Sequence, residues 1–563
     1  MRLGRHADVW QGVAQAAPDR PAVVSRSRRL THAEFTAEAA ALARHLEHAG
    51  IRPGDSVVIY SYNRPEFLVT LYACLATGVA PVPLNFRYRA NELRDLLLDC
   101  EARMLVYPSS LGAVVTEAIA GLQSPPAQLE VDDDAAPTAP TTPTTPTAAT
   151  AATTSTGPAG QAGPTAVAYH EAVAEPGALP AVPPPGGELR LYTGGTTGMP
   201  KAVLWDTDHL LDGMLFSTYS LVGIDPPQTV EEAVAIAVDR APRVATLPLA
   251  PFIHGTALFT SLNTLVLGGT VIIHASPRLD VEEALRLLHD EAATRLVLAG
   301  DAVALPLVTA AEQAGTGLGQ VRSVISSGMR LSDETKRRLH ALADLTIADL
   351  LAATEGGPFA AAITSSVDDL PARLKLMDDA AVLDNDGVEV QDRVGALGRL
   401  AFRGAFAKGY LGDEAKTRET FREFGGRRYV VPGDWARVLG DGHIELLGRG
   451  SAVVNTGGEK VYPAEVEQAL LDHPEVDDAV VFGTPDRRFG EAVTAVIVPA
   501  AGASIDPAEL ANHLDRRLAG YKKPRHVLFR DSLERSPHGK LDLARLKRDA
   551  TAELAERSAE VVP

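Results

Sequence analysis

The sequence has little cysteine, few aromatic residues and no long hydrophobic run. Its two cysteines, Cys74 and Cys100, have neither the paired spacing of a metal site nor the number needed for a disulfide framework. No stretch reaches the roughly 18 consecutive apolar residues that a transmembrane helix requires, and the N-terminal residues lack the apolar core of a secretory signal peptide. We therefore expect a cytoplasmic enzyme without a membrane span, in which both cysteines are inert.

An excess of positive charge is also absent. The chain has 53 lysines and arginines against 72 aspartates and glutamates, which gives a formal net charge of −19 at pH 7. Such an acidic chain is poorly suited to bind nucleic acid or an anionic membrane over a broad surface. With 563 residues and 45% hydrophobic composition, it is long and apolar enough for several globular cores and more than one domain.

Short apolar runs alternate along the chain with segments of helical period that are rich in Ala, Leu, Glu and Arg. This alternation is typical of βα units and predicts an α/β fold with largely parallel sheets. The runs that we expect to form strands include Ser56–Tyr62, Leu189–Thr193, Thr270–Ala275, Thr294–Gly300 and Val321–Gly328.

Two breaks in this pattern divide the chain. Residues 132–166 are rich in Ala, Thr and Pro and contain too little apolar bulk to pack, so we interpret them as a surface loop. A second break near Leu446–Pro463 precedes another set of alternating strands and helices. We therefore expect a large N-terminal domain of mixed and parallel sheets with helices over residues 1–449, and a small, mobile α+β domain over residues 450–563.

A loop rich in glycine and threonine follows one of the predicted strands. The stretch Leu191–Trp205 reads LYTGGTTGMPKAVLW. Consecutive glycines let backbone N–H groups converge, and threonine hydroxyls with a lysine add donors and positive charge, so the loop suits a polyphosphate. It is not a Walker loop, because Met199 and Pro200 separate the last glycine from Lys201, and Ala202 follows that lysine. On its own, the stretch could equally be a flexible turn.

Further motifs follow this loop in a fixed order. They read PLAPFIHG at Pro248–Gly255, SVISSGMRL at Ser323–Leu331, LAATE at Leu351–Glu355, GRLAFRGAFAKGYLGDEAKT at Gly398–Thr417, YVVPGDWA at Tyr429–Ala436, GRGSAVVNTGGEKVYPAEVE at Gly448–Glu467 and SPHGK at Ser536–Lys540. Together with YTGGTTGMPKAV, these motifs resemble those of the adenylate-forming superfamily, which comprises acyl-CoA synthetases, peptide-synthetase adenylation domains and luciferases. The resemblance spans almost the whole chain except residues 132–166, and the sequence looks most like actinobacterial ligases of fatty, steroid side-chain or terpenoid acids.

The resemblance implies a two-step reaction at one site that uses ATP, Mg²⁺ and coenzyme A. A carboxylate attacks the α-phosphate of ATP, which gives an acyl-adenylate and pyrophosphate. The small domain then rotates about a hinge, and the thiol of CoA displaces AMP. The expected binding partners are thus a hydrophobic carboxylic acid, or its acyl-adenylate, and CoA.

The resemblance also implies roles for individual residues. The catalytic residues would be Lys540, His254, Glu355 and Thr354, with Glu355 as the ligand of Mg²⁺. Nucleotide binding would fall to Thr193, Gly194, Gly195, Thr196, Thr197, Gly198, Lys201, Ser327, Gly328, Leu351, Ala352, Asp434 and Arg449. Ser451 would be the hinge residue. The CoA-binding loop would comprise Gly457, Gly458, Glu459 and Lys460, and the acyl pocket would include Phe252, His254, Ser326, Gly356 and Gly357.

Most of these residues also have an ordinary structural interpretation. A solitary glutamate such as Glu355 is more often solvated, a solitary histidine such as His254 is most often a satisfied core residue, and Asp434 could belong to a turn. The stretch Asn455–Lys460 could be only a hairpin turn, and the basic run Tyr521–His526 could be a solvated face rather than a contact for CoA phosphates. The ordered series of motifs favours the functional interpretation.

The sequence departs from the superfamily pattern at LAATE, where Leu351 and Ala352 replace the usual tyrosine and glycine. A stacking surface for adenine is lost, and a Cβ is added where the backbone approaches the nucleotide. We therefore hypothesise that adenylation is weak or absent, and that a separate adenylating enzyme supplies the acyl-adenylate. The phosphate loop, Lys201, Glu355 and Lys540 argue against a complete loss of function.

The small residues near Thr354–Ala362 leave volume for a wide acid, and we expect a bulky hydrophobic substrate. Two other classes of function stay open. One is an enzyme that loads a carrier protein in trans, since no carrier domain follows Lys540. The other is a non-catalytic relative that binds nucleotide or acyl groups. The sequence also leaves the oligomeric state open, including a homodimer.

Overall fold

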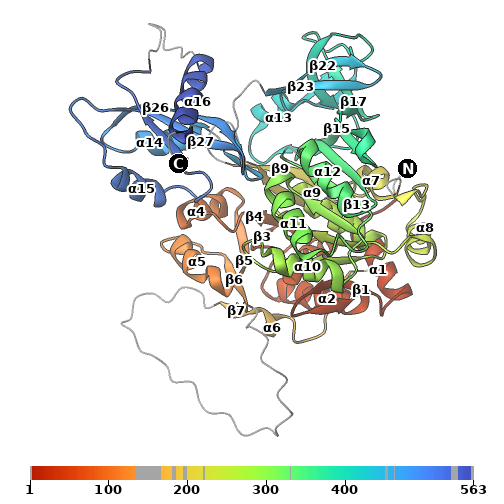
Figure 1. Ribbon diagram of the computed structural model, residues 1–563. Coiled ribbons are helices and arrows are strands. Elements are labelled where there is room, and N and C mark those ends of the chain that lie inside the picture. Colours follow the sequence, from red (N-terminus) through yellow and green to blue (C-terminus); the bar gives the residue numbers. More distant parts are fainter. Residues whose placement is uncertain are drawn as a thin grey trace, which may run out of the picture.

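The computed structural model describes residues 3–133, 166–180, 185–193, 200–219, 222–329, 331–449, 454–461, 463–533 and 543–559. The predicted class is confirmed, because a large α/β body is followed by a small α+β unit (Figure 1). All five runs that the sequence analysis assigned to strands contain one. These are β3 (Ser56–Tyr60), β8 (Glu188–Thr193), β11 (Thr270–Ile273), β12 (Arg295–Leu298) and β13 (Ser323–Ser327).

The largest sheet within the described residues has 15 strands. Its first part is mainly parallel and joins β2 (Arg29–Thr31), β1 (Pro21–Ser25), β11, β10 (Ala245–Pro248), β12, β13 and β14 (Thr346–Ala353) in this order. The second part is antiparallel and continues through β15 (Gly356–Thr364), β16 (Lys375–Leu376), β23 (His443–Arg449), β22 (Asp434–Gly440), β18 (Leu397–Phe402), β21 (Arg427–Val430) and β20 (Phe421–Phe424), with β17 (Ala380–Leu383) beside β18.

Helices cover both faces of the parallel part, as expected for consecutive βα units. On one face, side chains of β10, β12 and β13 pack against α10 (Val281–Asp290), α11 (Gly300–Ala314) and α12 (Asp333–Leu342). On the other face, the core includes α1 (His6–Ala16), α2 (His32–His48), α3 (Pro65–Thr77) and α9 (Gly255–Val266). The side chains of one strand alternate between these two cores, so Leu296 and Leu298 pack on the first and Val297 on the second.

A second parallel sheet lies on the N-terminal side of the molecule. It consists of β4 (Ala80–Leu84), β3, β5 (Ala102–Pro108), β6 (Ala127–Val131) and β7 (Val167–Ala168), with α4 (Ala90–Asp99) and α5 (Gly112–Ile119) packed on it. Residues 134–165, most of the predicted surface loop, lie outside the described residues. The predicted loop begins at residue 132, but Asp133 still belongs to the folded part. It accepts hydrogen bonds from the Tyr62 hydroxyl and the Ser110 backbone N–H.

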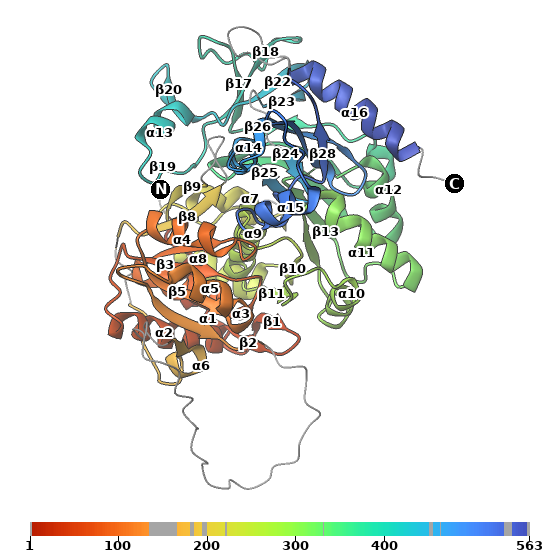
Figure 2. The same cartoon turned by 90° about the vertical axis from the view of Figure 1, so that its left-hand side faces the viewer.

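The small unit has its own sheet and two apolar cores. Its strands β24 (Val454–Thr456), β25 (Glu459–Val461), β26 (Val476–Asp486), β27 (Gly490–Pro499) and β28 (His526–Phe529) pack against α14 (Pro463–Leu471), α15 (Pro507–Asp515) and α16 (Leu543–Ala559). Figures 1 and 2 show α15 close to α4 of the large unit, and Arg89, the residue before α4, forms an ion pair of 3.9 Å with Asp515, the last residue of α15.

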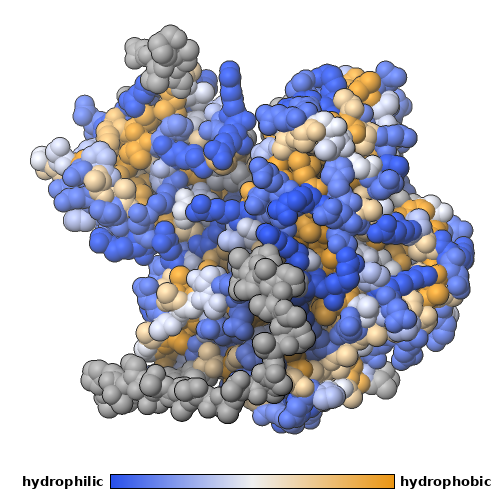
Figure 3. Space-filling model, turned by 60° about the horizontal axis from the view of Figure 1, so that its bottom comes forward, coloured by the Kyte–Doolittle hydropathy of each residue, from blue (hydrophilic) through white to orange (hydrophobic). Residues whose placement is uncertain are grey.

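The surface agrees with the acidic composition of the chain. Figure 3 shows one face on which hydrophilic side chains predominate and hydrophobic ones lie between them. No helix of the described chain is both long enough and apolar enough to cross a bilayer.

Candidate active site

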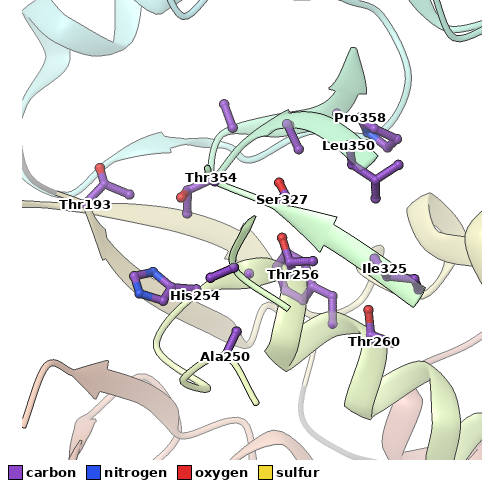
Figure 4. A pocket seen from close by; sticks show the side chains of 18 of the residues that line it. Thr193, Ala250, His254, Thr256, Thr260, Ile325, Ser327, Leu350, Thr354 and Pro358 are labelled. Carbon is purple, nitrogen blue, oxygen red and sulfur yellow. The ribbon is translucent and has the colours of Figure 1, made fainter. Parts of the chain in front are cut away.

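A cavity of about 490 Å³ lies where α9, the β14–β15 hairpin and the small unit meet. The large unit contributes mostly small and apolar side chains, among them Ala250, Ala299, Ala348 and Leu350. Figure 4 shows that Thr193 and His254 lie towards one end of this cavity, and that Thr260 and Ile325 lie towards the other. The small unit contributes Gly458, Glu459 and Lys460 together with Glu465, Tyr521 and Lys522.

The glycine loop of the small unit is a tight hairpin that reaches into the large unit. Gly457 and Gly458 connect β24 to β25 with φ values of +61° and +85°, a left-handed conformation that favours glycine at two successive positions. A Cβ on Gly458 would lie 3.3 Å from the Cβ of Ala299 in the large unit. This segment is therefore a hairpin turn, and it also reaches the wall of the cavity.

Glu459 joins this hairpin to the large unit. Its carboxylate accepts a hydrogen bond of 2.8 Å from Nη1 of Arg87 and a longer one of 3.4 Å from Nδ2 of Asn85. Nε2 of His254 lies 3.8 Å from the same carboxylate. Burial lowers the pKa of His254, and although Glu459 opposes this effect, the imidazole is expected to be neutral at neutral pH.

Lys522 makes a second link between the two units. Its side chain is only 3% exposed, and Nζ donates hydrogen bonds to Glu92 of α4 at 2.7 Å and to Glu465 of α14 at 2.6 Å. Burial alone would lower the pKa of Lys522, but Tyr88, Glu92 and Glu465 together raise it above the usual value. This lysine of the basic run Tyr521–His526 is thus a buried ion-pair residue and does not belong to a solvated face.

The turn between β14 and β15 holds Thr354 and Glu355. Nε1 of Trp205 donates a hydrogen bond of 2.9 Å to the backbone carbonyl of Thr354, and the hydroxyl of Tyr410 donates one of 2.6 Å to Glu355. The part of the chain that the structure describes contains no group of three His, Cys, Asp or Glu side chains suited to a metal. A single oriented carboxylate nevertheless fits Mg²⁺, which proteins often hold by one or two carboxylates together with substrate phosphates.

Two other predicted nucleotide-binding residues, Lys201 and Asp434, each stand at the start of a strand. Lys201 begins β9 (Lys201–Asp206), which pairs with β8, and its ammonium forms an ion pair with Asp413. Asp434 begins β22 and lies opposite Arg449 in the strand register. Neither Lys201 nor Asp434 lines the cavity.

The structure brings many of the predicted site residues to the cavity. Those that line it are Thr193, His254, Ser327, Gly328, Ala352, Thr354, Gly356, Gly357, Gly458, Glu459 and Lys460. Gly457 lines a smaller adjoining cavity of about 110 Å³, which His254 also borders. Gly194, Gly195, Thr196, Thr197, Gly198, Ser451 and Lys540 lie outside the described residues, as does the side chain of Arg449.

Three expected positions differ from the structure. Phe252 does not line the acyl pocket, because its ring is fully buried in the core against Phe67, with ring centroids 5.2 Å apart. Ser326 and Leu351 point away from the cavity, since successive strand residues face opposite sides. Ser326 accepts a hydrogen bond from the backbone N–H of Gly300, and Leu351 packs against the main core. Their neighbours Ile325, Ser327, Leu350 and Ala352 line the cavity instead.

Several residues of the site were not predicted from the sequence. They are Asn85 and Arg87 at the hairpin, Tyr410 at Glu355, Asp413 at Lys201, and Arg295 on β12. Most of their partners lie more than 50 residues away in the chain, so local pattern gives no signal for the pairing. Tyr410 and Asp413 do fall within the matched stretch Gly398–Thr417, which marked the region without marking the residues.

Comparison with known proteins agrees with this geometry. The family model described as AMP-binding enzyme matches residues 10–411, and the model for the C-terminal domain of these enzymes matches residues 465–540. A medium-chain acyl-CoA ligase of Mycobacterium avium is 34% identical over 561 residues, which covers 95% of this chain and 96% of the relative. A 3-oxocholest-4-en-26-oate–CoA ligase of Rhodococcus rhodochrous is 34% identical over 556 residues, covering 95% of this chain and 94% of the relative.

Solved structures show the same fold at lower sequence identity. The o-succinylbenzoate CoA synthetase of Bacillus subtilis aligns with a TM-score of 0.74 at 22% identity and covers 96% of this chain and 98% of its own. A fatty acyl CoA synthetase of Mycobacterium tuberculosis aligns with a TM-score of 0.63 at 22% identity and covers 98% of this chain and 99% of its own. With both parts matched in order along one chain, the protein belongs to the AMP-binding enzymes, the adenylate-forming superfamily.

Proposed function

We propose that the protein is an acyl-CoA ligase that joins a bulky hydrophobic carboxylic acid to CoA through an acyl-adenylate. The observation that carries the proposal is the Gly457–Gly458 hairpin, which the Arg87–Glu459 ion pair holds beside His254 at the apolar cavity. Ligase relatives at about one-third identity over nearly the full chain support the same activity. The small domain would begin at residue 450, with Ser451 as its hinge.

In the first step, a carboxylate oxygen of the acid attacks the α-phosphate of ATP and pyrophosphate leaves. The repulsion between these anions is the main obstacle, so positive charge and oriented donors at the phosphates lower the barrier. Thr193 and Thr354 line the cavity where they could donate to phosphate oxygens. Mg²⁺ would neutralise phosphate charge, and Glu355, oriented by Tyr410, would hold it. Lys540 is assigned to this step only by the superfamily resemblance.

In the second step, the thiol sulfur of CoA attacks the acyl carbonyl, the bond to phosphate breaks and AMP leaves with its electron pair. The Gly457–Gly458 hairpin has little side-chain bulk and borders His254, so it provides a narrow approach for a slender thiol arm. Because burial lowers the pKa of His254, its neutral ring can accept the thiol proton. Release of acyl-CoA and AMP, and loss of the proton from His254 to solvent, restore the free site.

The proposal includes an adenylation step that is weaker than the thioester-forming step. The methyl group of Ala352 lines the cavity at the position where the superfamily has glycine, and it narrows the space near the nucleotide. Leu351 packs on the core and offers no stacking surface to adenine. A separate adenylating enzyme would then supply part of the acyl-adenylate.

The size of the cavity supports a bulky acid. Its volume of about 490 Å³, which the acid would share with the nucleotide, lies within the range of sites for drug-sized ligands, and the alanines of its wall leave space for a wide acid. The medium-chain acid in the name of one relative and the steroid acid in the name of another bracket the size that we propose.

The test is to supply the protein with Mg²⁺, CoA and a panel of bulky acids, each as free acid with ATP or as synthetic acyl-adenylate. Acyl-CoA is measured by mass spectrometry, with a phosphopantetheinylated carrier protein as the competing acceptor. The proposal predicts free acyl-CoA from the adenylates, and slower formation from acid and ATP. If no acyl-CoA forms from either the free acids or the acyl-adenylates, the protein is not an acyl-CoA ligase. If only the carrier protein is acylated, the acceptor is the carrier protein and not CoA.

A further inference from the structure

Arg295 is a buried cation at the wall of the acyl cavity. It is the first residue of β12, a central strand of the largest sheet, and only 5% of its surface is exposed. Strand alternation places its side chain on the same face as Val297, towards α9, and away from Leu296 and the helices α10 to α12. The cavity lies on this face, and Arg295 is one of the residues that line it.

The guanidinium of Arg295 has no partner among the residues that the structure describes. No hydrogen bond or ion pair to it occurs in the described chain, and its Nε is buried without an acceptor. Burial alone lowers the pKa of Arg295 to about 10, so no neighbouring carboxylate compensates for it. The group still carries a full charge at neutral pH. Because an unpaired buried charge is costly, a residue of this kind usually has a function that an apolar residue could not perform.

The position of Arg295 corresponds to the end of the cavity that is remote from the reacting carboxyl group. Val297 lies opposite Ile325 in the strand register, and Figure 4 shows Ile325 and Thr260 on the side away from His254 and Thr193. Arg295 and Leu298 are the first and last residues of β12, and both line the cavity. Three residues of a strand span about 10 Å, so Arg295 lies about that far from Leu298 along the cavity wall. An acid whose carboxyl group lies near His254 would therefore extend its far end towards Arg295.

Polar groups accompany Arg295 at this end. Thr260 and Asn263 on α9 and Ser217 on α7 (Leu215–Tyr219) line the same cavity. The side chain of Asn263 donates a hydrogen bond of 3.4 Å to the Ser217 hydroxyl. A purely hydrocarbon tail would leave the guanidinium unpaired and remove its remaining access to water, which disfavours such a tail.

We propose that Arg295 determines specificity by binding an oxygen acceptor, a ketone or a carboxylate, at the far end of the acid. The inference rests on the proposed function and narrows its substrate to elongated acids with oxygen at both ends. An acceptor there pairs the buried charge, whereas an unsubstituted tail does not. Selectivity thus arises from the penalty paid by the wrong substrate as well as from the bond made by the correct one.

The test compares three acids of one skeleton, with a methyl group, a ketone or a carboxylate at the far end, in a series of chain lengths. Each is supplied as its synthetic acyl-adenylate with CoA, so adenylation cannot limit the rate. For the wild type we expect kcat/KM to be about 10- to 100-fold higher for the ketone or the carboxylate than for the methyl compound, as for a hydrogen bond to a charged group. The better of the two oxygenated acids identifies the acceptor.

Two variants and one control connect this preference to Arg295. Arg295→Met keeps the length of the side chain and should remove the preference, whereas Arg295→Lys keeps the charge and should retain part of it. The control is Arg322→Met, which removes an exposed arginine next to the start of the adjacent strand β13 and should leave the preference unchanged. Equal preference in the wild type and in Arg295→Met, or none in the wild type, would overturn the proposal.

A binding measurement separates this inference from the proposed function. The free acids should raise the melting temperature of the wild type more when they carry the distal oxygen, and this difference should vanish in Arg295→Met. It can be measured even if no acyl-CoA forms at all. Without ligand, Arg295→Met should melt at a higher temperature, because an unpaired buried charge has been removed. A lower melting temperature would assign Arg295 a structural role and overturn the proposal.

Discussion

Glu92 offers a way to weaken the contact between the two units without touching the cavity. It belongs to α4 of the large unit, and its carboxylate accepts one of the two hydrogen bonds from the buried ammonium of Lys522 in the small unit. Glu92→Gln removes the negative charge but keeps a carbonyl oxygen, which can still accept the hydrogen bond from the backbone N–H of Arg89 at the start of the helix. The substitution therefore acts mainly on the contact between the units.

The size of the effect follows from burial. A hydrogen bond to a charged group contributes about 1.5–3 kcal/mol, and a contact buried as deeply as Lys522 is little screened by solvent. Since about 1.4 kcal/mol corresponds to a factor of ten, the equilibrium constant for docking of the small unit should fall about 10- to 100-fold. The thioester-forming step, for which we propose that the docked hairpin is needed, should slow, whereas adenylation should not.

The two half-reactions can be assayed separately. Formation of acyl-CoA from synthetic acyl-adenylate and CoA reports the second, and release of pyrophosphate from acid and ATP reports the first. Small-angle scattering reports the docked population directly. The comparison variant is Glu465→Gln, which removes the other carboxylate bound to Lys522; Glu465 lies in the same unit as that lysine and, unlike Glu92, also lines the cavity.

The expected result is a loss of thioester formation and of compactness in Glu92→Gln that exceeds the loss in Glu465→Gln. Equal losses in the two variants would mean that Lys522 stabilises only the small unit. Equal slowing of both half-reactions would mean that docking is not specific to the second step. Either result refutes the reasoning from this contact.

Three further predictions concern other parts of the chain. Ala352→Gly should increase ATP-dependent pyrophosphate release, because it removes the methyl group from the cavity, and no gain would argue against the weak-adenylation hypothesis. Gly458→Ala should slow acyl-CoA formation from acyl-adenylate, since φ is +85° and the new Cβ would lie 3.3 Å from that of Ala299, and an unchanged rate would contradict the close approach. Burial lowers the pKa of His6 and of His32 to about 4, so the unfolded chain binds more protons between about pH 6.5 and 4. Stability should therefore be lost as the pH falls through this range, by about 3 kcal/mol for each histidine, and urea unfolding of His32→Gln should show a smaller loss than the wild type.

The strands and the order of the motifs could be predicted because they depend on local sequence. Each apolar run formed a strand, and the glycine pair at 457 and 458 formed the hairpin turn that its composition favours. Those signals come from a few consecutive residues and do not depend on the rest of the chain.

The direction of single side chains could not be predicted in the same way. Ser326 and Leu351 lie next to residues that line the cavity, but a strand turns each successive side chain to the opposite face. If a motif is aligned one residue too early or too late, the residue assigned to the cavity is therefore one whose side chain points into the core. The sequence pattern locates the strand, but it does not determine which of its residues face the cavity.

Contacts between distant segments were equally inaccessible from the sequence. The basic run Tyr521–His526 looks solvated because four of its six residues are basic or histidine, yet Lys522 is buried between carboxylates of α4 and α14. Arg295 begins an ordinary apolar strand, and the feature that distinguishes it is that its guanidinium has no partner among the described residues. Both findings require knowledge of what surrounds a side chain in space.

The cavity wall is completed by residues of the small unit, namely Gly458, Glu459, Lys460, Glu465, Tyr521 and Lys522. In the proposed reaction, a wide acid would enter before this wall closes, and the acyl-CoA product would leave after it opens. Opening of this wall in the proposed cycle would break the Glu92–Lys522 and Arg87–Glu459 contacts, which join the two units. On that proposal, the stability of these two ion pairs would limit turnover, because stronger contacts would shield the acyl-adenylate from water for longer and would delay opening.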